Sequence, residues 1–191
     1  MSQKFERREF LTRAVLAGTT LSVGAGTLLQ PQRALAAKGP NEKLNLGCIG
    51  VANKGGHNID NLTSENIVAL CDVDSLYLGK SSEKFPKAKT YADFRQMLDK
   101  EKSLDAVVVS TPDHTHFPAT QMAMERGIHV YTQKPLAHNV WQCRTLARAK
   151  DRYKVMTQMG NQGHADDGIR NSVEAVRAGV IGDVSQIFCR N

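Results

Sequence analysis

The sequence predicts an α/β fold in which helices cover both faces of a doubly wound parallel sheet. Short apolar runs rich in Val and Ile alternate with segments of helical periodicity, which is the pattern of such a sheet. The run Val107–Val109 has no polar alternation, so we expect its strand to be covered on both faces. A glycine-rich turn directly follows the first strand, where folds of this class bind ligands.

The composition is that of an ordinary globular protein. The 191 residues are 41% hydrophobic and 23% charged, which excludes a disordered, collagen-like or coiled-coil chain as a whole. Half of the net charge of +6 lies in residues 1–36, and the other basic residues are dispersed without an aromatic-rich RNA motif. Nucleic-acid binding is therefore not expected. The four cysteines have no metal-ligand spacing, and Cys48 and Cys71 lie in apolar runs as small buried hydrophobes, a disulfide being the less favoured alternative.

Residues 1–36 have the three-part pattern of a signal peptide. A positive start precedes the uncharged, mildly hydrophobic residues 14–29, and an A-x-A end predicts cleavage after Ala36. Arg7 and Arg8 are typical of the twin-arginine export signal of bacteria. We therefore expect export by the twin-arginine route to a periplasmic or extracytoplasmic location, without a stable membrane span. The alternative interpretation is a disordered basic N-terminus.

A polar linker, residues 37–43, is followed by the predicted elements. Residues 44–163 form the expected ligand-binding domain, and residues 164–191 the start of a second α/β domain that is cut short at Asn191. Strands are expected in the apolar runs Leu44–Ile49, Asn66–Cys71, Asp105–Ser110, Ile128–Thr132, Lys154–Gln158 and Val184–Arg190.

Helices are predicted between these strands by apolar stripes at helical spacing, which we interpret as core faces. Glycines at 127 and 179 are expected to end two of these helices. The four stripes are Phe94 with Met97 and Leu98, Ala119 with Met122 and Ala123, Val140 with Cys143 and Ala147, and Ile169 with Val173 and Val176.

The turn after the first strand fits a dinucleotide fingerprint. Gly50, Ala52 and Gly55 occupy the positions for a tight turn, a close approach to the pyrophosphate and close helix packing. Ala52 replaces the usual second glycine, and a glycine-rich turn without a ligand is the alternative.

A carboxylate follows the second strand at the position that binds ribose hydroxyls. Asp72 lies 22 positions after Gly50 and would repel the 2′-phosphate of NADP. NAD is therefore the favoured cofactor, with NADP as the alternative. Asp74 is close enough to share this role, but we interpret it as a helix cap.

The loop Ser110–His116 follows the third strand and should line the ligand crevice. Pro112 would stiffen this loop beside the nicotinamide. His116 is expected to orient a loop or contact the ligand, and His114 to be solvated. We expect no metal site, because no second cluster of ligand residues accompanies the two histidines.

The loops after the fourth and fifth strands carry further polar residues. Lys134 could exchange a proton with a substrate hydroxyl if its environment lowers its pKa, and a surface lysine is the alternative. Asn161 and Gln162 could face a sugar or the nicotinamide.

In this order, the segments resemble the N-terminal half of the Gfo/Idh/MocA family, the relatives of glucose–fructose oxidoreductase and inositol dehydrogenase. The resemblance covers about residues 44–191 and is most specific in Val107–His116, His129–Leu136 and Ala178–Asp183. The export signal and the Gln-Lys-Pro variant are similar to exported members from planctomycete-type bacteria.

The resemblance implies a Rossmann-type domain that binds NAD(P), followed by an α/β substrate domain that usually mediates homo-oligomers. It implies catalytic roles for Lys134 and His116, and substrate contacts from Lys134, Asn161 and Gln162. The implied cofactor contacts are Gly50, Ala52, Asn53, Gly55, Asp72, Thr111, Pro112, Gln133 and Lys134.

The implied activity is that of an exported oxidoreductase, which transfers hydride between NAD(P) and a hydroxyl of a small sugar or cyclitol. The alternatives are an NAD-dependent glycosidase that uses transient redox chemistry and a non-catalytic dinucleotide-binding protein. Gln133 replaces the family's usual Glu, which leaves Lys134 without a neighbouring carboxylate. The family's further catalytic Asp and His lie in the second domain, so we expect this chain alone to bind a dinucleotide with little turnover.

Overall fold

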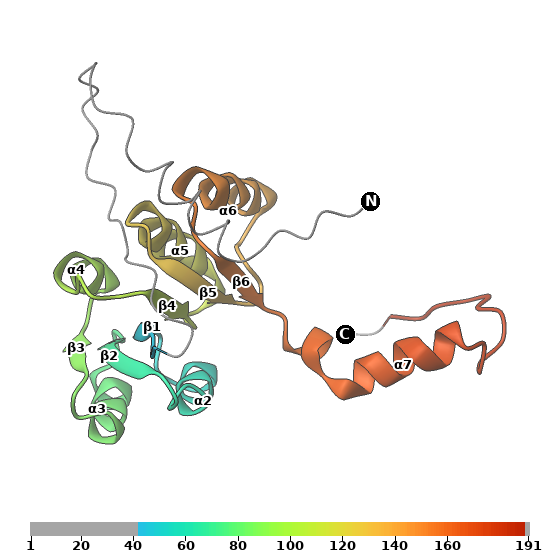
Figure 1. Cartoon of the computed structure of the whole chain (residues 1–191), viewed down its shortest axis with the longest axis horizontal. Coiled ribbons are helices and arrows are strands. Elements are labelled where there is room, and N and C mark those ends of the chain that lie inside the picture. Colours follow the sequence, from blue (N-terminus) through green and yellow to red (C-terminus); the bar gives the residue numbers. More distant parts are fainter. Residues whose placement is uncertain (1–41, 190–191) are drawn as a thin grey trace, which may run out of the picture. The chain divides into compact units, whose positions relative to one another are not determined.

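The computed structural model describes residues 42–189, so the predicted signal peptide lies outside the described residues. Within this range, six parallel strands form one sheet in the order β3-β2-β1-β4-β5-β6 (Figure 1). This order confirms the predicted doubly wound α/β fold. The strands are β1 (Asn45–Ile49), β2 (Asn66–Cys71), β3 (Lys89–Tyr91), β4 (Ala106–Val109), β5 (His129–Gln133) and β6 (Thr157–Gly160).

The parallel pairing brings the carboxyl ends of the strands to one edge of the sheet. Ile49 at the end of β1 pairs with both Cys71 and Val109. At the other side, Gln133 of β5 pairs with Gly160 of β6. The loops that follow these strands therefore lie along the same edge, and they carry the candidate residues.

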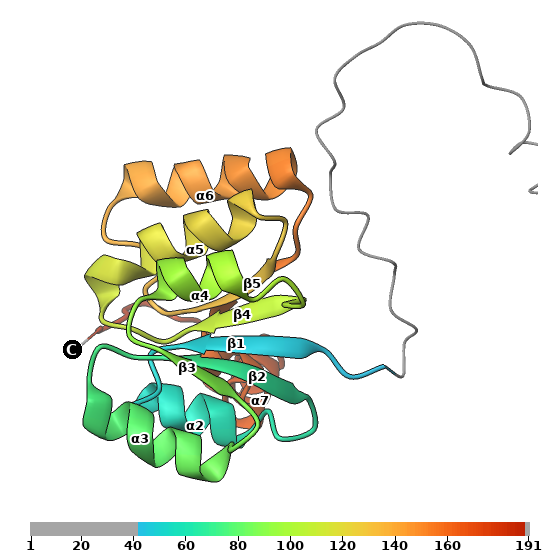
Figure 2. The same cartoon turned by 90° about the vertical axis from the view of Figure 1, so that its left-hand side faces the viewer.

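Helices cover both faces of the sheet (Figure 2). The short helices α2 (Lys54–Asp60) and α3 (Ser75–Lys84) lie on one face, while α4 (Phe94–Lys100), α5 (His116–Glu125) and α6 (Val140–Tyr153) lie on the other. In the part of the chain that the structure describes, the remaining helix is α7 (Asp167–Arg177), and two short 3₁₀ turns are η1 (Asp113–Thr115) and η2 (Gln162–Ala165). Within residues 42–189, no helix is long and apolar enough to cross a membrane.

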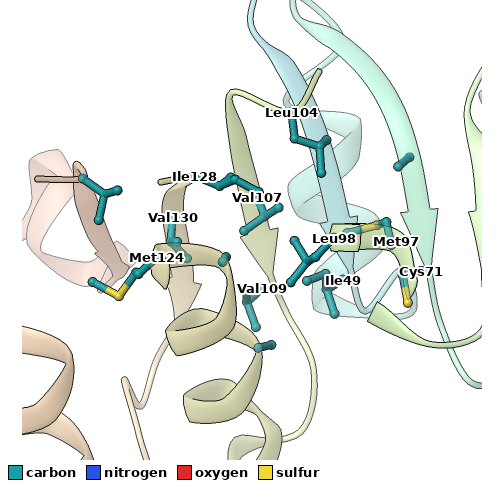
Figure 3. Packing of buried hydrophobic residues seen from close by; sticks show 14 of the residues in the cluster. Ile49, Cys71, Met97, Leu98, Leu104, Val107, Val109, Met124, Ile128 and Val130 are labelled. Atoms are coloured by element: carbon teal, nitrogen blue, oxygen red, sulfur yellow. The ribbon is translucent and has the colours of Figure 1, made fainter. Parts of the chain in front are cut away.

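The core consists of two apolar clusters on opposite faces of the sheet. Val107 and Val109 are fully buried in the cluster that includes Met97 and Leu98 of α4 (Figure 3). Val108 belongs to the other cluster, so β4 is covered on both faces as its sequence predicts. This arrangement explains why the strand has no polar alternation.

Cys48 and Cys71 are small core residues, as the sequence predicts. Cys48 and Cys71 are buried, and all four cysteines are free thiols. Burial raises the pKa of each buried thiol to about 12, with Asp72 and Asp93 adding to the effect at Cys71. Neither buried thiol forms an appreciable thiolate near neutral pH.

Three predicted features were wrong. In α6, Val140 is 66% exposed, and the buried face is formed by Leu146 and Ala149 instead. Residues 184–189 form no strand, because none of the described backbone pairs with them. The apolar stripe of α7 was expected to be a core face, but its residues are 41–46% exposed: Ile169, Val173 and Val176.

Candidate functional site

The turn after β1 is shaped by Gly50, which ends the strand at a φ of 85°. Its N–H donates to the carbonyl of Cys71 at 2.8 Å, which holds the turn against the end of β2. A Cβ on Gly50 would lie 2.6 Å from the backbone oxygen of Ser110. Only glycine therefore allows the ends of β1 and β4 to approach this closely.

The first turn of α2 packs directly against this glycine-rich turn. A Cβ on Gly55 would lie 2.1 Å from the carbonyl oxygen of Gly50, so helix and turn touch through their backbones. Asn53 precedes the helix with a φ of 46°, and its side chain forms no cap. Within residues 42–189, the N–H groups of Ala52 and Asn53 have no hydrogen-bond partner. They are available to an anionic group at the start of the helix.

Asp72 is held at the turn by two backbone donors. Its carboxylate accepts hydrogen bonds from the N–H of Val51 at 2.8 Å and from the N–H of Asp74 at 3.0 Å. An ionised carboxylate has about four lone-pair positions, so about two remain for ribose hydroxyls. Asp74 instead caps α3, accepting from the N–H of Leu76 and Tyr77, which confirms its interpretation as a helix cap.

The loop after β4 is tied to α2 by a side-chain hydrogen bond. The amide of Asn58 donates to the hydroxyl of Ser110 at 2.9 Å. The next residue, Thr111, has a buried hydroxyl oxygen without a hydrogen-bond partner among the described residues. Buried polar atoms are normally paired, so this hydroxyl suits a polar group of a bound ligand. Pro112 and His114 are exposed beside it.

His116 joins the loop after β4 to the loop after β5. Its side chain is buried, with Nε2 lying 2.8 Å from the carbonyl oxygen of Thr111 and Nδ1 lying 2.6 Å from that of Pro135. Both ring nitrogens are therefore engaged by the protein backbone. The geometry supports the expectation that His116 orients a loop, and it leaves no ring nitrogen for a reacting atom.

Lys134 is exposed at the end of β5, and its peptide bond to Pro135 is cis. It forms no ion pair with any residue in the range 42–189. The next residue, Pro135, has the carbonyl oxygen that lies beside Nδ1 of His116. Lys134 is therefore accessible to a substrate, on a loop whose position depends on a buried side chain.

Gln133 is buried and belongs to an uncharged network beside Lys134. Its Oε1 accepts from the amide of Gln162 at 2.7 Å, and that amide also donates to the Tyr131 hydroxyl at 3.2 Å. A Cβ on Gly160 would lie 2.0 Å from the same Gln133 oxygen. The absence of a side chain at position 160 therefore makes room for this network.

The polar residues after β6 lie in different surroundings. Gln162 is exposed, and its amide is used in holding Gln133. Asn161 is exposed and precedes η2 without forming a side-chain cap. The structure thus brings Gln162 to the base of the Lys134 loop, while Asn161 remains accessible to solvent.

No individual site role was predicted for Asn58 or Gly160, and Ser110 was predicted only as the start of the loop that lines the ligand crevice. The sequence carries no local signal for Asn58, because its role depends on a hydrogen bond to Ser110, 52 residues away along the chain. For Ser110 and Gly160 the signal is their place at the carboxyl end of a strand, Ser110 directly after β4 and Gly160 as the last residue of β6, where the ligand crevice of this fold lies.

The described residues fit a dinucleotide such as NAD at this edge. The fit rests on three observations: the close packing of Gly55 on Gly50, the two unpartnered N–H groups beside it, and the unpartnered Thr111 hydroxyl. Asp72 adds a carboxylate 22 positions after Gly50, where this fold places the group that binds the ribose. Among residues 42–189, no three potential metal ligands lie together.

Comparison with known proteins agrees with this geometry. Residues 23–161 match the family model Gfo/Idh/MocA, described as an oxidoreductase family with an NAD-binding Rossmann fold. A glycosyl hydrolase family 109 protein from Solibacter usitatus is 29% identical over 202 residues, covering 95% of this chain and 44% of that protein. Inositol 2-dehydrogenase from Rubrobacter xylanophilus is 26% identical, covering 76% of this chain and 43% of the enzyme.

Solved structures show the same fold. The crystal structure of myo-inositol 2-dehydrogenase from Lactobacillus plantarum matches with a TM-score of 0.69 and 26% identity, over 75% of this chain and 43% of that one. The chain therefore spans less than half the length of these relatives. The cofactor expected from the sequence, NAD, is the one named in the description of the matched family.

Proposed function

Because the chain belongs to the Gfo/Idh/MocA family of oxidoreductases with an NAD-binding Rossmann fold, we propose that residues 45–160 bind NAD for hydride transfer at a sugar or cyclitol hydroxyl. The observation that carries the proposal is the contact between Gly50 and Gly55 beside the carboxylate of Asp72. This arrangement places available N–H donors and a ribose-binding carboxylate at the same turn.

Each part of the site then has a distinct task. The turn from Gly50 to Asn53 binds the pyrophosphate through backbone N–H groups, and Asp72 binds the adenosine ribose. The hydroxyl of Thr111 binds the nicotinamide half, beside Pro112. When bound, NAD supplies the hydride acceptor.

Lys134 exchanges the proton of the substrate hydroxyl. It lies on the exposed loop after β5, where a small molecule can reach its ammonium group. Gln133, the residue before Lys134, accepts a hydrogen bond from the amide of Gln162, so a neutral amide takes the place of a carboxylate beside the lysine. The same loop is tied to the nicotinamide side of the site by His116.

Titration of the purified 191-residue chain with NADH, followed by nicotinamide fluorescence, tests the proposal. We expect saturable binding of NADH that is displaced by NAD and is tighter than that of NADPH. Circular dichroism of the same sample verifies that the protein is folded. A folded chain that binds neither reduced dinucleotide would contradict the proposed function.

A second candidate function is an NAD-dependent glycosidase, favoured by the names of several relatives. One of these is alpha-N-acetylgalactosaminidase from Shewanella oneidensis, 27% identical over 158 residues. The two functions differ in the fate of the hydride. An oxidoreductase accumulates NADH when given NAD and a polyol, whereas the glycosidase releases a sugar from a chromogenic glycoside without net NADH. The assay needs a protein with the full length of the relatives.

Export by the twin-arginine route and assembly into homo-oligomers are further parts of the proposal. They are supported by Arg7 and Arg8 before the hydrophobic residues 14–29, and by the resemblance to oligomeric family members. Replacing both arginines by lysine should retain a fused reporter in the cytoplasm, while replacing Lys4 should not. Light scattering of the purified protein reports the oligomeric state.

A further inference from the structure

A pocket of about 270 Å³ lies beneath α6, on the face of the sheet that α4, α5 and α6 cover. Most of its lining comes from four elements that lie side by side, α5, α6, β5 and β6 (Figure 1). The inner wall is formed by buried side chains, among them Met124, Val130 and Leu146. At the rim, Ala147 and Lys150 are exposed, so the pocket is open to solvent.

Two buried threonine hydroxyls line the inner wall of this pocket. Thr120 and Thr132 are 2% and 1% exposed, and their hydroxyl oxygens lie 2.7 Å apart. Two hydroxyls carry two protons, and the hydrogen bond between them uses one. Within residues 42–189, neither hydroxyl forms another hydrogen bond, so the second proton has no acceptor, whichever threonine donates. By contrast, the hydroxyl of Thr145 in α6 donates to the carbonyl of Trp141 at 2.9 Å.

The unused hydroxyl proton calls for an uncharged acceptor. A buried donor without a partner costs free energy, so a ligand oxygen that accepts this proton is stabilised at the inner wall. Lys150 is the one charged residue in the described lining, and its side chain is 51% exposed at the rim. No cation therefore balances an anion beside the two threonines, and burying an unpaired charge is costly. The carbonyl oxygen of a ketone, aldehyde or ester has the required chemistry.

The volume of the pocket limits the size of its ligand. Sites for drug-sized molecules measure about 300–1,000 Å³, whereas an apolar cavity of about 150 Å³ holds one benzene molecule. The 270 Å³ of this pocket lie between these values, which leaves room for one ring or a short chain that carries a carbonyl group. The apolar side chains of Met124, Val130 and Leu146 favour a ligand whose body is hydrocarbon.

We propose that this pocket is a second ligand site of the domain, which binds a small uncharged carbonyl compound through the hydroxyl pair of Thr120 and Thr132. The carbonyl oxygen accepts the unused proton of the pair, and the hydrocarbon body packs against the buried side chains of α5, α6 and β5. Leu136 also lines the pocket, so the ligand contacts the loop that carries Lys134. The proposal does not rest on the proposed function, because no residue of the dinucleotide turn lines this pocket.

Nuclear magnetic resonance of the methionine methyl groups in the 191-residue chain tests the site, with the aromatic ketone acetophenone as the probe. An aromatic ring shifts the signals of the methyl groups that it contacts. Met124 and Met159 line the pocket, whereas Met97 is buried in another part of the core. We expect saturable shifts of the Met124 and Met159 signals and none at Met97. The absence of saturable shifts at the two pocket methionines, up to the solubility limit of acetophenone, overturns the inference.

The role of the hydroxyl pair is tested with ethylbenzene, which has a similar shape to acetophenone but no oxygen. In Thr120→Val/Thr132→Val, both partners become apolar groups of the same shape, a change that can be nearly neutral for stability. We expect the ratio of acetophenone to ethylbenzene affinity to fall by about fivefold, the equivalent of one neutral hydrogen bond. Thr145→Val, which changes a threonine outside the pocket, should keep the wild-type ratio. An unchanged ratio in the double variant contradicts the assigned role of the hydroxyls.

A filled pocket and a competition experiment complete the test. Ala147→Phe places a large side chain at the rim and should weaken the binding of both probes, whereas Arg148→Phe changes the next residue, outside the lining, and should not. Acetophenone binding without NADH binding contradicts the proposed function alone. Displacement of acetophenone by NADH would place the probe in the dinucleotide site and overturn this inference. If a variant fails to fold, the methionine shifts and the NADH competition in the wild-type chain still decide whether the pocket is a ligand site.

Discussion

Gly55 illustrates at the scale of one residue how the cofactor turn depends on backbone contact. The methyl group of Gly55→Ala would lie 2.1 Å from a backbone oxygen, so α2 must move away from the turn. We expect a loss of NADH affinity of at least about tenfold, with lower stability, because the pyrophosphate site is displaced. Fluorescence titration and thermal unfolding measure the two effects.

The control is a glycine-to-alanine change in another helix. Gly79 lies in α3, is exposed, and has no atom within 4 Å of its Cβ position. Gly79→Ala should raise the free energy of unfolding by up to about 1 kcal/mol and leave NADH binding unchanged. Equal effects of the two substitutions would contradict the packing argument.

Asp72 is expected to set the choice between NAD and NADP. Asp72→Asn keeps one oxygen to accept from Val51 N–H and removes the charge that repels a 2′-phosphate. We predict that the ratio of NADPH to NADH affinity rises by about tenfold. Asp74→Asn removes a neighbouring carboxylate that caps α3, and it should leave this ratio unchanged because Asn is an equally good cap.

At the scale of elements, Glu101 ties β3 to the end of α4. Its buried carboxylate accepts from the Tyr91 hydroxyl and from Lys89 Nζ at 2.9 Å. Burial raises the pKa of Glu101, but the hydrogen bonds from Tyr91 and Lys89 outweigh burial and hold the pKa below its usual range. The hydrogen bond to Glu101, followed by burial, raises the pKa of Tyr91 to about 12.

These pKa shifts predict the pH dependence of stability. The contribution of Glu101 is present above its unfolded pKa of 4.5 and is lost as pH falls through the lower folded value. Glu101→Gln should lower the free energy of unfolding by about 1–2 kcal/mol at neutral pH and by less in acid. Urea unfolding at several pH values measures this. Asp99→Asn breaks an exposed pair with Arg126 and should change stability little.

The elements differ in how far their sequences predicted them. The strands at the centre of the sheet are continuous apolar runs, so the sequence predicted both ends of β1, β2 and β4 to within one residue. By contrast, β3 is the three residues Lys-Thr-Tyr at the edge of the sheet, and its pairing with β2 depends on tertiary contacts that no local pattern encodes. The face of α6 was misplaced because Val140 continues an apolar spacing into an exposed first turn.

The site was predictable where the chemistry depends on spacing along the chain. The spacing of Gly50 and Gly55 after the first strand, and of Asp72 22 positions after Gly50, predicts that these residues belong to the site. The bridging geometry of His116 and the space that Gly160 leaves for Gln133 depend on loops that are distant in sequence and adjacent in the sheet. Such contacts become visible only when the strand order is known.

At the scale of the whole molecule, we expect the 191-residue chain to bind the cofactor without catalysing the oxidation of a substrate. The chain spans 44% of its glycosyl hydrolase family 109 relative. We predict that the 191-residue chain binds NADH and oxidises sugars or cyclitols at no measurable rate, as followed by NADH absorbance with excess polyol. Robust turnover by this chain would refute the prediction.

Lys134 distinguishes an enzyme from a non-catalytic dinucleotide-binding protein. In a protein with the full length of the relatives, Lys134→Ala should reduce turnover by about 10²–10⁴-fold, the usual contribution of a general acid or base, with NADH affinity within about twofold. Unchanged turnover would favour a non-catalytic role for this loop. Lys150→Ala, which changes an exposed lysine of α6, is the control.

The central place of β1 in the sheet also determines the order in which the domain can assemble. Asn45 at the start of β1 bonds to Asp105 just before β4, a separation of 60 residues. A ribosome needs roughly 3–12 s to add these residues, at about 5–20 residues per second. Throughout that interval the backbone N–H and C=O groups along the β4 side of β1 have no neighbouring strand. The first of the six described strands to leave the ribosome therefore gains its second neighbour late, and until then its unpaired edge is open to pairing with other chains.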